Sequence, residues 1–201
     1  MKTILTFVLL NIAFNCNAQN YQWRPIVPGI DCIDSTFNNC QVSFLVNDTF
    51  HNTLWLLGIF EGGGGVSSAY AVGFDGTNWI PFPGIFNASI LSYTNCAIMY
   101  NGNLILGKDD RIEEFNFSTL QWSTIGNSSS EVLCLAIFNN DLIAGGYFSN
   151  INGTGNHIAK WNGIQWDTLG SGITGSSHIV MSLEIYNGKL FAGGTFDFAG
   201  G

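Results

Sequence analysis

Four carboxylates crowd one short stretch of the chain, where paired acids could serve acid–base catalysis or hold a calcium ion. They are Asp109, Asp110, Glu113 and Glu114. On a strand, two side chains share a face only when they are an even number of positions apart, so the adjacent acids in each pair diverge. The chain also lacks a DxDxDG-type loop of the kind that binds calcium. We therefore interpret the stretch as a solvated hairpin rather than a catalytic or calcium site.

The three histidines could ligate zinc or act as general bases, but they are scattered along the chain. They are His51, His157 and His178, and no HExxH-type spacing joins them. The Gly-x-Ser-x-Gly signature of serine hydrolases is missing as well. The glycines after Glu61 are not followed by the Lys-Ser/Thr pair of a phosphate-binding loop. The sequence thus predicts no catalytic residue, no metal site and no cofactor-binding residue.

Four cysteines remain once a predicted N-terminal export segment is removed. Cys32 and Cys40 bracket DCIDSTFNNC, and in an oxidising compartment we predict that they form a disulfide. Cys96 and Cys134 occupy the same position in two neighbouring repeats, on the predicted innermost strand. A bridge there would need a Cα separation below about 7 Å. We interpret this second pair as buried free thiols.

Short strands arranged as a repeat are the elements that would position these residues. The stretch from Val132 to Gly170 contains the apolar runs VLCLAIF, LIAGGYF, HIAKW and IQWDTL. The turns Asn139-Asn140 and Asn162-Gly163 separate them in pairs, and both are typical of two-residue β-hairpins. Four short antiparallel strands in about forty residues are typical of one blade of a β-propeller.

Imperfect copies of this stretch recur along the chain. From Val180, VMSLEIYNGKLFAGGTF repeats VLCLAIFNNDLIAGGYF at an offset of 48 residues, and from Cys96, CAIMYNGNLILG repeats it at an offset of 38. A tryptophan recurs at intervals of 43 and 44 residues, at Trp79, Trp122 and Trp166. A residue that every repeat needs is expected to pack between blades, so we interpret these tryptophans as core rather than as a sugar-stacking surface.

The repeats predict an all-β fold, a β-propeller of four-stranded antiparallel blades, present here as an incomplete fragment with three blades and half of a fourth. The blades are predicted at about 42–87, 92–128, 131–174 and, truncated, 178–201. The insertion Asn47–Thr53 lengthens the first hairpin of the first blade. Residues 19–41 hold a loop and, around Trp23, one more copy of the outermost strand. Such a strand closes a propeller ring by completing the blade built by the other terminus.

The N-terminus predicts export. Residues 1–18 combine Lys2, an apolar run and a small residue, Ala18, as a secretory signal peptide does, and the run is too short to span a membrane. Cys16 raises a lipoprotein alternative, which Asn15 in front of it fits poorly. Without Lys2 the chain carries 5 basic and 14 acidic side chains, a net charge of −9. That charge argues against nucleic acid or an anionic membrane as a partner.

FNFSTLQWSTIG, with an aromatic, a polar turn and a tryptophan, is similar to the kelch pattern, and Gly145-Gly146 is similar to the kelch double glycine. The chain from about Val42 to Gly201 resembles the kelch and galactose-oxidase-like β-propeller superfamily. It resembles most the secreted multi-repeat proteins of Bacteroidota, whose repeats read LYAGGxF…IAKWDGxxWxxLGxG. Many of those proteins carry a sorting domain for type 9 secretion and cell-surface attachment.

The resemblance implies a secreted or cell-surface binding scaffold that recognises extracellular protein or glycan through its blade loops. The alternative is part of a secreted enzyme whose active site lies in missing blades or in an attached catalytic domain. Galactose oxidase needs copper ligands and a cross-linked Tyr-Cys pair, and nothing in this sequence indicates them.

Overall fold

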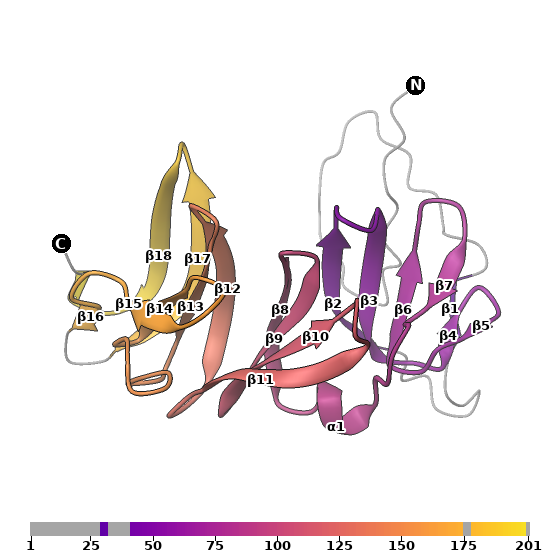
Figure 1. Ribbon diagram of the computed structural model, residues 1–201, viewed down its shortest axis with the longest axis horizontal. Coiled ribbons are helices and arrows are strands. Elements are labelled where there is room, and N and C mark those ends of the chain that lie inside the picture. Colours follow the sequence, from indigo (N-terminus) through magenta and orange to yellow (C-terminus); the bar gives the residue numbers. More distant parts are fainter. Residues whose placement is uncertain (1–28, 32–40, 175–177, 200–201) are drawn as a thin grey trace. The chain divides into compact units, whose positions relative to one another are not determined.

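The computed structural model describes residues 29–31, 41–174 and 178–199, and these form an all-β protein (Figure 1). Three antiparallel sheets have four strands each. In sheet order, the first is β2 (Gln41–Asp48), β3 (Thr53–Ile59), β6 (Ala71–Phe74) and β7 (Trp79–Pro81); the second is β8 (Thr94–Tyr100), β9 (Asn103–Lys108), β10 (Arg111–Asn116) and β11 (Gln121–Asn127); the third is β12 (Val132–Phe138), β13 (Asp141–Gly146), β14 (Ile158–Trp161) and β15 (Trp166–Thr168).

The remaining elements are small. A fourth sheet pairs β17 (Ile179–Tyr186) with β18 (Lys189–Thr195). Short pairings join β1 (Ile30–Asp31), β4 (Gly62–Gly63) and β5 (Val66–Ser67), and join β16 (Ile173–Thr174) to β19 (Phe198–Ala199). The helix α1 (Ala88–Leu91) has 4 residues. The predicted all-β class and four-stranded antiparallel sheets are confirmed, and the propeller arrangement stays a prediction. The signal peptide, the Trp23 strand and the Cys32–Cys40 bridge lie outside the described residues.

The chain divides into two compact units. One is built from residues up to Leu45 together with Asn52–Leu91, and the other from Val46–His51 together with Ser92 onward. In the first unit, Leu56, Phe60, Val72 and Trp79 form the buried core. The second unit contains the second, third and fourth sheets, and its two cores lie between successive sheets.

The sequence repeat is a structural repeat in the second unit. The hairpins β8–β9, β12–β13 and β17–β18 each contain a β-bulge at the same place, before Cys96, Cys134 and Ser182. Each hairpin turns through two residues with positive φ, as type I′ turns require. The turn residues are Asn101-Gly102, Asn139-Asn140 and Asn187-Gly188. The predicted turn at Asn139-Asn140 is therefore confirmed.

On the hairpins β8–β9 and β12–β13, a glycine receives a valine from the following sheet. A Cβ added at Gly107 would lie 2.9 Å from Val132 Cγ1, and one added at Gly145 would lie 2.6 Å from Val180 Cγ1. Both approaches are closer than real Cβ contacts allow, so only glycine leaves room for the valine at these two places. We call this arrangement the glycine–valine contact. It explains why the repeat keeps a glycine inside a strand, where glycine otherwise weakens the sheet.

A cysteine accompanies each glycine–valine contact. Cys96 Sγ lies 3.6 Å from the carbonyl oxygen of Val132, and Cys134 Sγ lies 3.6 Å from that of Val180. Both cysteines are free and half-buried. Burial raises the pKa of both thiols, that of Cys134 to about 12. These sulfurs are packing groups that act as weak donors rather than reactive thiols.

The recurring tryptophans are packing residues in the two repeats where they are buried. Trp166 Nε1 donates a 2.8 Å hydrogen bond to the Ile125 carbonyl oxygen of the second sheet, and the indole covers Gly126. Trp79 lies over Gly63 and Gly64 within the first unit. Trp122 is half-buried and packs against Phe115, with ring centroids 5.2 Å apart.

Candidate functional site

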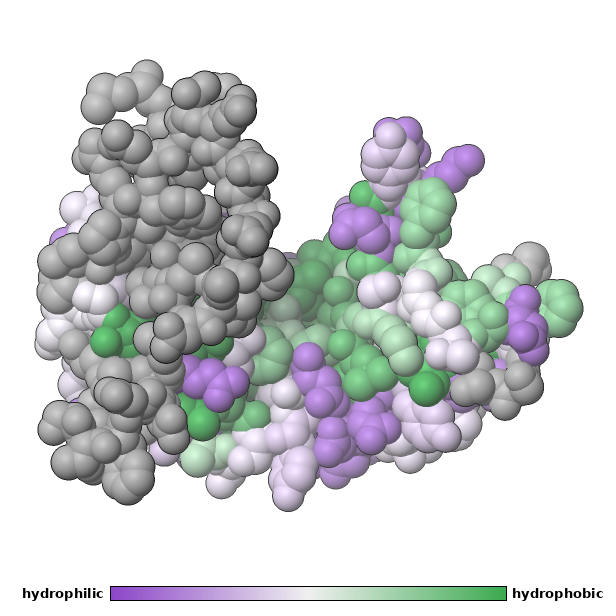
Figure 2. Space-filling model, turned by 180° about the vertical axis from the view of Figure 1, so that it is seen from behind, coloured by the Kyte–Doolittle hydropathy of each residue, from purple (hydrophilic) through white to green (hydrophobic). Residues whose placement is uncertain are grey.

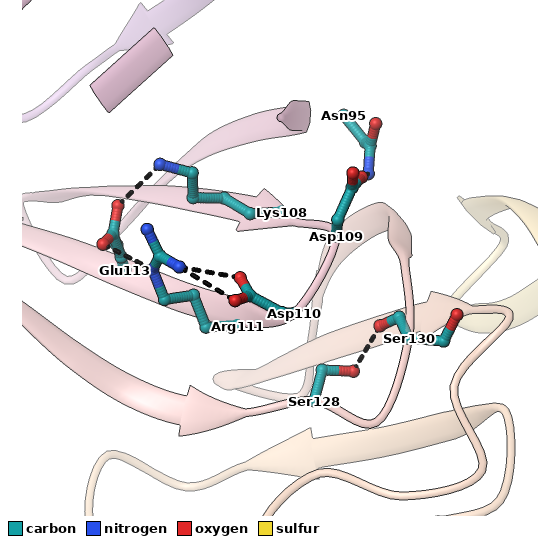
Figure 3. Close-up of polar contacts among 8 residues, drawn as sticks. All are labelled: Asn95, Lys108, Asp109, Asp110, Arg111, Glu113, Ser128 and Ser130. Carbon is teal, nitrogen blue, oxygen red and sulfur yellow. Dashed lines mark hydrogen bonds and ion pairs between the residues drawn. The ribbon is translucent and has the colours of Figure 1, made fainter. Parts of the chain in front are cut away.

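The acidic stretch forms the tight turn between β9 and β10 and the first part of β10, and two of its four carboxylates pair with neighbouring cations (Figure 3). Glu113 accepts from Lys108 Nζ at 3.0 Å and from Arg111 Nε at 2.7 Å. Arg111 also reaches both oxygens of Asp110, at 2.8 and 3.0 Å. Burial alone would raise the pKa of Glu113, but the hydrogen bonds from Arg111 and Lys108 outweigh it and lower the pKa below its ordinary value.

The other two acids accept hydrogen bonds from asparagine amides. Asn95 Nδ2 donates to Asp109 at 2.9 Å, and Asn103 Nδ2 donates to Glu114 at 2.8 Å. The turn is only partly solvated, because the side chain of Lys108 is 1% exposed and that of Glu113 is 17% exposed. Within the described residues, no group of three or more potential ligands could hold a metal ion. The cluster therefore acts as an ion-pair network that orders the turn.

Two of the three histidines, far apart in sequence, come together beside the third and fourth sheets. The rings of His157 and His178 stack with centroids 4.9 Å apart and planes inclined by 17°. Because imidazole lone pairs lie in the ring plane, parallel rings do not converge on one metal ion. His157 Nδ1 is buried with no hydrogen-bond partner in the described structure. Burial, and secondarily His178, lowers the pKa of His157.

The third histidine belongs to the turn between β2 and β3, which the insertion Asn47–Thr53 lengthens. Asp48, whose side chain is fully buried, accepts from the backbone N–H groups of Phe50 at 3.1 Å and His51 at 3.0 Å. His51 Nδ1 lies 2.6 Å from the second carboxylate oxygen of Asp48. One carboxylate thus fixes both the backbone of the turn and the orientation of the imidazole, in the manner of an Asx turn.

Aromatic rings surround the imidazole that Asp48 orients. The Phe50 ring meets His51 edge to face at 4.9 Å, and Phe117, which follows β10, lies 4.7 Å from His51. Phe50 also lies over the neighbouring turn at Gly102. Phe50 is nevertheless 76% exposed. We call Phe50, His51 and Phe117 the aromatic cap. It is the strongest candidate for a functional site in the described part of the chain.

The aromatic cap offers a rigid apolar surface with one polar edge. Exposed aromatic rings bind sugars and peptides by stacking on their C–H groups, and a fixed imidazole supplies hydrogen bonds at the margin. The sequence predicts the insertion that contains His51, but the contacts of His51 with Asp48 and Phe117 were not predicted from it. An Asp three residues before a His, inside an insertion with an aromatic residue between them, is the local signal that could have found part of the cap.

No protein-family model matches the chain, and no curated protein matches it significantly. None of the helices in the described residues is long and apolar enough to cross a membrane.

Proposed function

We propose that this protein is a β-propeller repeat protein that works as a secreted or cell-surface binding scaffold, with extracellular protein or glycan as its ligand. The observation that carries the proposal is the aromatic cap. The hairpins β8–β9, β12–β13 and β17–β18 turn through two residues. The β2–β3 hairpin has a longer turn, and this turn exposes Phe50. The buried Asp48 carboxylate accepts from the Phe50 backbone, and the phenyl group contacts the His51 ring, which Phe117 supports in turn. A largely exposed ring held in this way contributes little to a core and suits recognition.

The propeller part of the proposal rests on the repeated contacts of the second unit. Each sheet there is joined to the next by a glycine–valine contact at the same register. In addition, Ser128 pairs with Ile151, and in the next repeat Ile173 pairs with Ala199, which corresponds to Ile151 at the 48-residue offset. Propellers extend their cores in this way, because each sheet makes the same set of contacts with the next sheet. The kelch-like sequence pattern supports the same arrangement.

The export part of the proposal rests on residues 1–18 and on composition. The N-terminal sequence of protein recovered from the medium or the cell surface should begin at Gln19. Full-length protein retained in the cytoplasm would contradict it.

Binding is tested by screening the full chain against an array of neutral and acidic glycans and against extracellular proteins from its own habitat. For the ligand found, Phe50→Ala should weaken binding by about tenfold or more, because a central exposed ring is the kind of residue that dominates affinity. Asp48→Asn should also weaken it by loosening the turn.

The matched control is Ile164→Ala, which removes another exposed apolar side chain, 84% exposed, from the turn between β14 and β15. This variant should bind as the original chain does. Binding that is indifferent to Phe50→Ala but sensitive to Ile164→Ala would place the site elsewhere.

A further inference from the structure

The second and third sheets each present one face to the sheet that follows, and the residues on these faces correspond. On the second sheet the core of the face is Ile105, and on the third it is Ile143. Their exposed fractions are 0% and 1%. At the same repeat position the fourth sheet carries Phe191, which is 51% exposed. The fourth sheet therefore has the same kind of face, and no described residue covers it. Figure 2 shows the β17–β18 hairpin at the upper right, with both hydrophobic and hydrophilic side chains on it.

The glycine of this face is also in place, but its valine is not. Gly193 corresponds to Gly107 and Gly145, and a Cβ added there would meet only Ser182 Oγ, at 2.7 Å. Ser182 in turn occupies the position of Cys96 and Cys134, whose sulfurs lie against the carbonyl oxygens of the valines in the next sheet. A serine hydroxyl is a better donor than a thiol. The fourth sheet thus keeps both the space and the donor of the contact.

We propose that the face of β17–β18 formed by Ser182, Glu184, Tyr186, Phe191 and Gly193 is a docking surface for one more antiparallel sheet of the same repeat series. In the docked state, a valine of that sheet lies over Gly193 and its carbonyl oxygen accepts from Ser182 Oγ. The occupant follows from continuity with the two interfaces already built this way in the second unit. This inference concerns assembly and does not depend on the proposed binding function.

Glu184 restricts which sheets can dock on this surface. The corresponding residues are Ile98, half-buried against the second core, and Ala136, which is 5% exposed. A carboxylate in this place would lose hydration on docking, so the incoming sheet must supply a cation or a hydrogen-bond donor opposite it. Pairing of this face with itself in a second copy is disfavoured for the same reason, because both copies would bring Glu184 into one interface.

The test compares two matched glycines in two forms of the chain. One form is the 201-residue chain. The other repeats residues 154–199 after Gly201, and because Gly201 corresponds to Gly153 at the 48-residue offset, the added segment continues the register. It adds strands to the fourth sheet and brings a second copy of Val180 to Gly193. Both forms also carry the original Glu184→Ala, which places the alanine of the third sheet at this position, because the facing side chains of the copied hairpin, Leu183 and Leu190, are apolar and supply no partner for a carboxylate. Gly145→Ala and the original Gly193→Ala are made in both forms, and thermal unfolding is measured.

Gly145→Ala should lower Tm by about 4 °C or more in both forms, since the new methyl group overlaps Val180. Gly193→Ala should be nearly neutral in the 201-residue chain, because a serine hydroxyl can rotate away, and should approach the loss seen for Gly145→Ala in the extended chain. An equal effect of Gly193→Ala in both forms, large or small, would overturn the proposal. A large effect in the short form that grows with protein concentration would indicate instead that a second copy covers the face.

A second readout does not depend on the stability of the variants. Tyr186, 65% exposed on this face, should be iodinated readily in the short form. In the extended form its iodination should slow toward that of the buried Tyr100 at the same repeat position. Unchanged iodination of Tyr186 in a folded extended chain would also overturn the proposal.

Discussion

The third sheet and the fourth sheet present equivalent faces that differ in what covers them. On the third sheet, Val180 lies over Gly145, and Ile143 and Ala136 are 1% and 5% exposed. On the fourth sheet, Gly193 has no described valine over it, and Phe191 is 51% exposed. Because the hairpins share register, bulge and turn, the backbone does not cause this difference. The side chains on a sheet face are therefore buried only where the next sheet packs against that face.

The comparison also shows which residues of the repeat serve the hairpin and which serve its neighbour. The asparagine turns and the bulge recur in the three hairpins β8–β9, β12–β13 and β17–β18. The residues that vary, such as Cys134 against Ser182 and Ala136 against Glu184, are those that face the following sheet. Substitutions at equivalent positions of the third and fourth sheets should therefore have unequal effects.

The largest difference is expected in thiol chemistry. Burial raises the pKa of Cys134 to about 12, whereas a cysteine introduced by Ser182→Cys would lie on the exposed face with an ordinary pKa. At pH 8 the new thiol should be alkylated by iodoacetamide about a thousand times faster than Cys134, because only the thiolate reacts. Mass spectrometry of peptides gives both rates in one sample. In denaturant the two rates should converge, and equal rates in the folded protein would contradict the comparison.

Truncation of the central apolar residue should lower the free energy of unfolding more on the third sheet than on the fourth. Ile143→Ala should lower the free energy of unfolding by about 2–5 kcal/mol, since it empties a closed core. Phe191→Ala should cost less than about 1 kcal/mol, because the ring is already half in water. Urea denaturation of both variants measures the difference. A Phe191→Ala cost equal to that of Ile143→Ala would mean that the fourth face is covered in solution.

One side-chain hydrogen bond joins the second and third sheets and can be removed by a single substitution. Trp166→Phe keeps most of the ring but removes the 2.8 Å hydrogen bond to the Ile125 carbonyl oxygen. The expected cost is about 1–2 kcal/mol of unfolding free energy. The control is Trp161→Phe, at the half-buried partner ring 5.5 Å away. If the control variant lost more stability than Trp166→Phe, the hydrogen bond would not be the source of the effect.

The stacked histidines, beside the third and fourth sheets, should make the stability of the protein mildly sensitive to acid. In the folded protein, burial and the neighbouring His178 hold the pKa of His157 below the ordinary value of about 6.5 that applies when the chain is unfolded. As pH falls below about 6.5, the unfolded chain binds the proton first, so stability decreases and levels off once the folded state is protonated as well.

This effect should stay well below about 1 kcal/mol, because His157 is only partly buried and solvent screens the charge. Its measurement is the slope of Tm against pH between pH 7.5 and 5 in the original chain and in His157→Asn. Asparagine suits the site because His157 has a φ of 60°. The variant should show the flatter slope. Identical slopes, or a chain that gains stability in acid, would remove His157 from the explanation.

Much of the fold could be predicted from sequence because the repeat uses local signals. The hairpin turn at Asn139-Asn140, the hairpin in the acidic stretch around Asp109-Asp110 and the all-β class each follow from residues adjacent in the chain. The buried role of Trp166 followed from its fixed spacing. These features need no knowledge of which segments meet in space.

The site could not be predicted because its contacts join distant or unusual residues. His51, in the turn between β2 and β3, meets Phe117, which follows β10. His157, before β14, meets His178, before β17. Nothing in the sequence indicated that Lys108, in the position of a glycine in other repeats, would be buried and paired with Glu113. A charge pattern alone predicts solvation, and only the surrounding packing decides otherwise.

The central claim is that equivalent faces differ in burial because a sheet covers some of them and not the other. It is tested most directly on two tyrosines at one repeat position. Tyr100 is 4% exposed and donates a hydrogen bond to the Asn140 carbonyl oxygen, whereas Tyr186 is 65% exposed. Brief iodination of the folded 201-residue chain, followed by peptide mass spectrometry, should modify Tyr186 and spare Tyr100. Equal protection of both tyrosines would show that something already covers the fourth face, and equal modification would show that the second and third sheets do not pack as described.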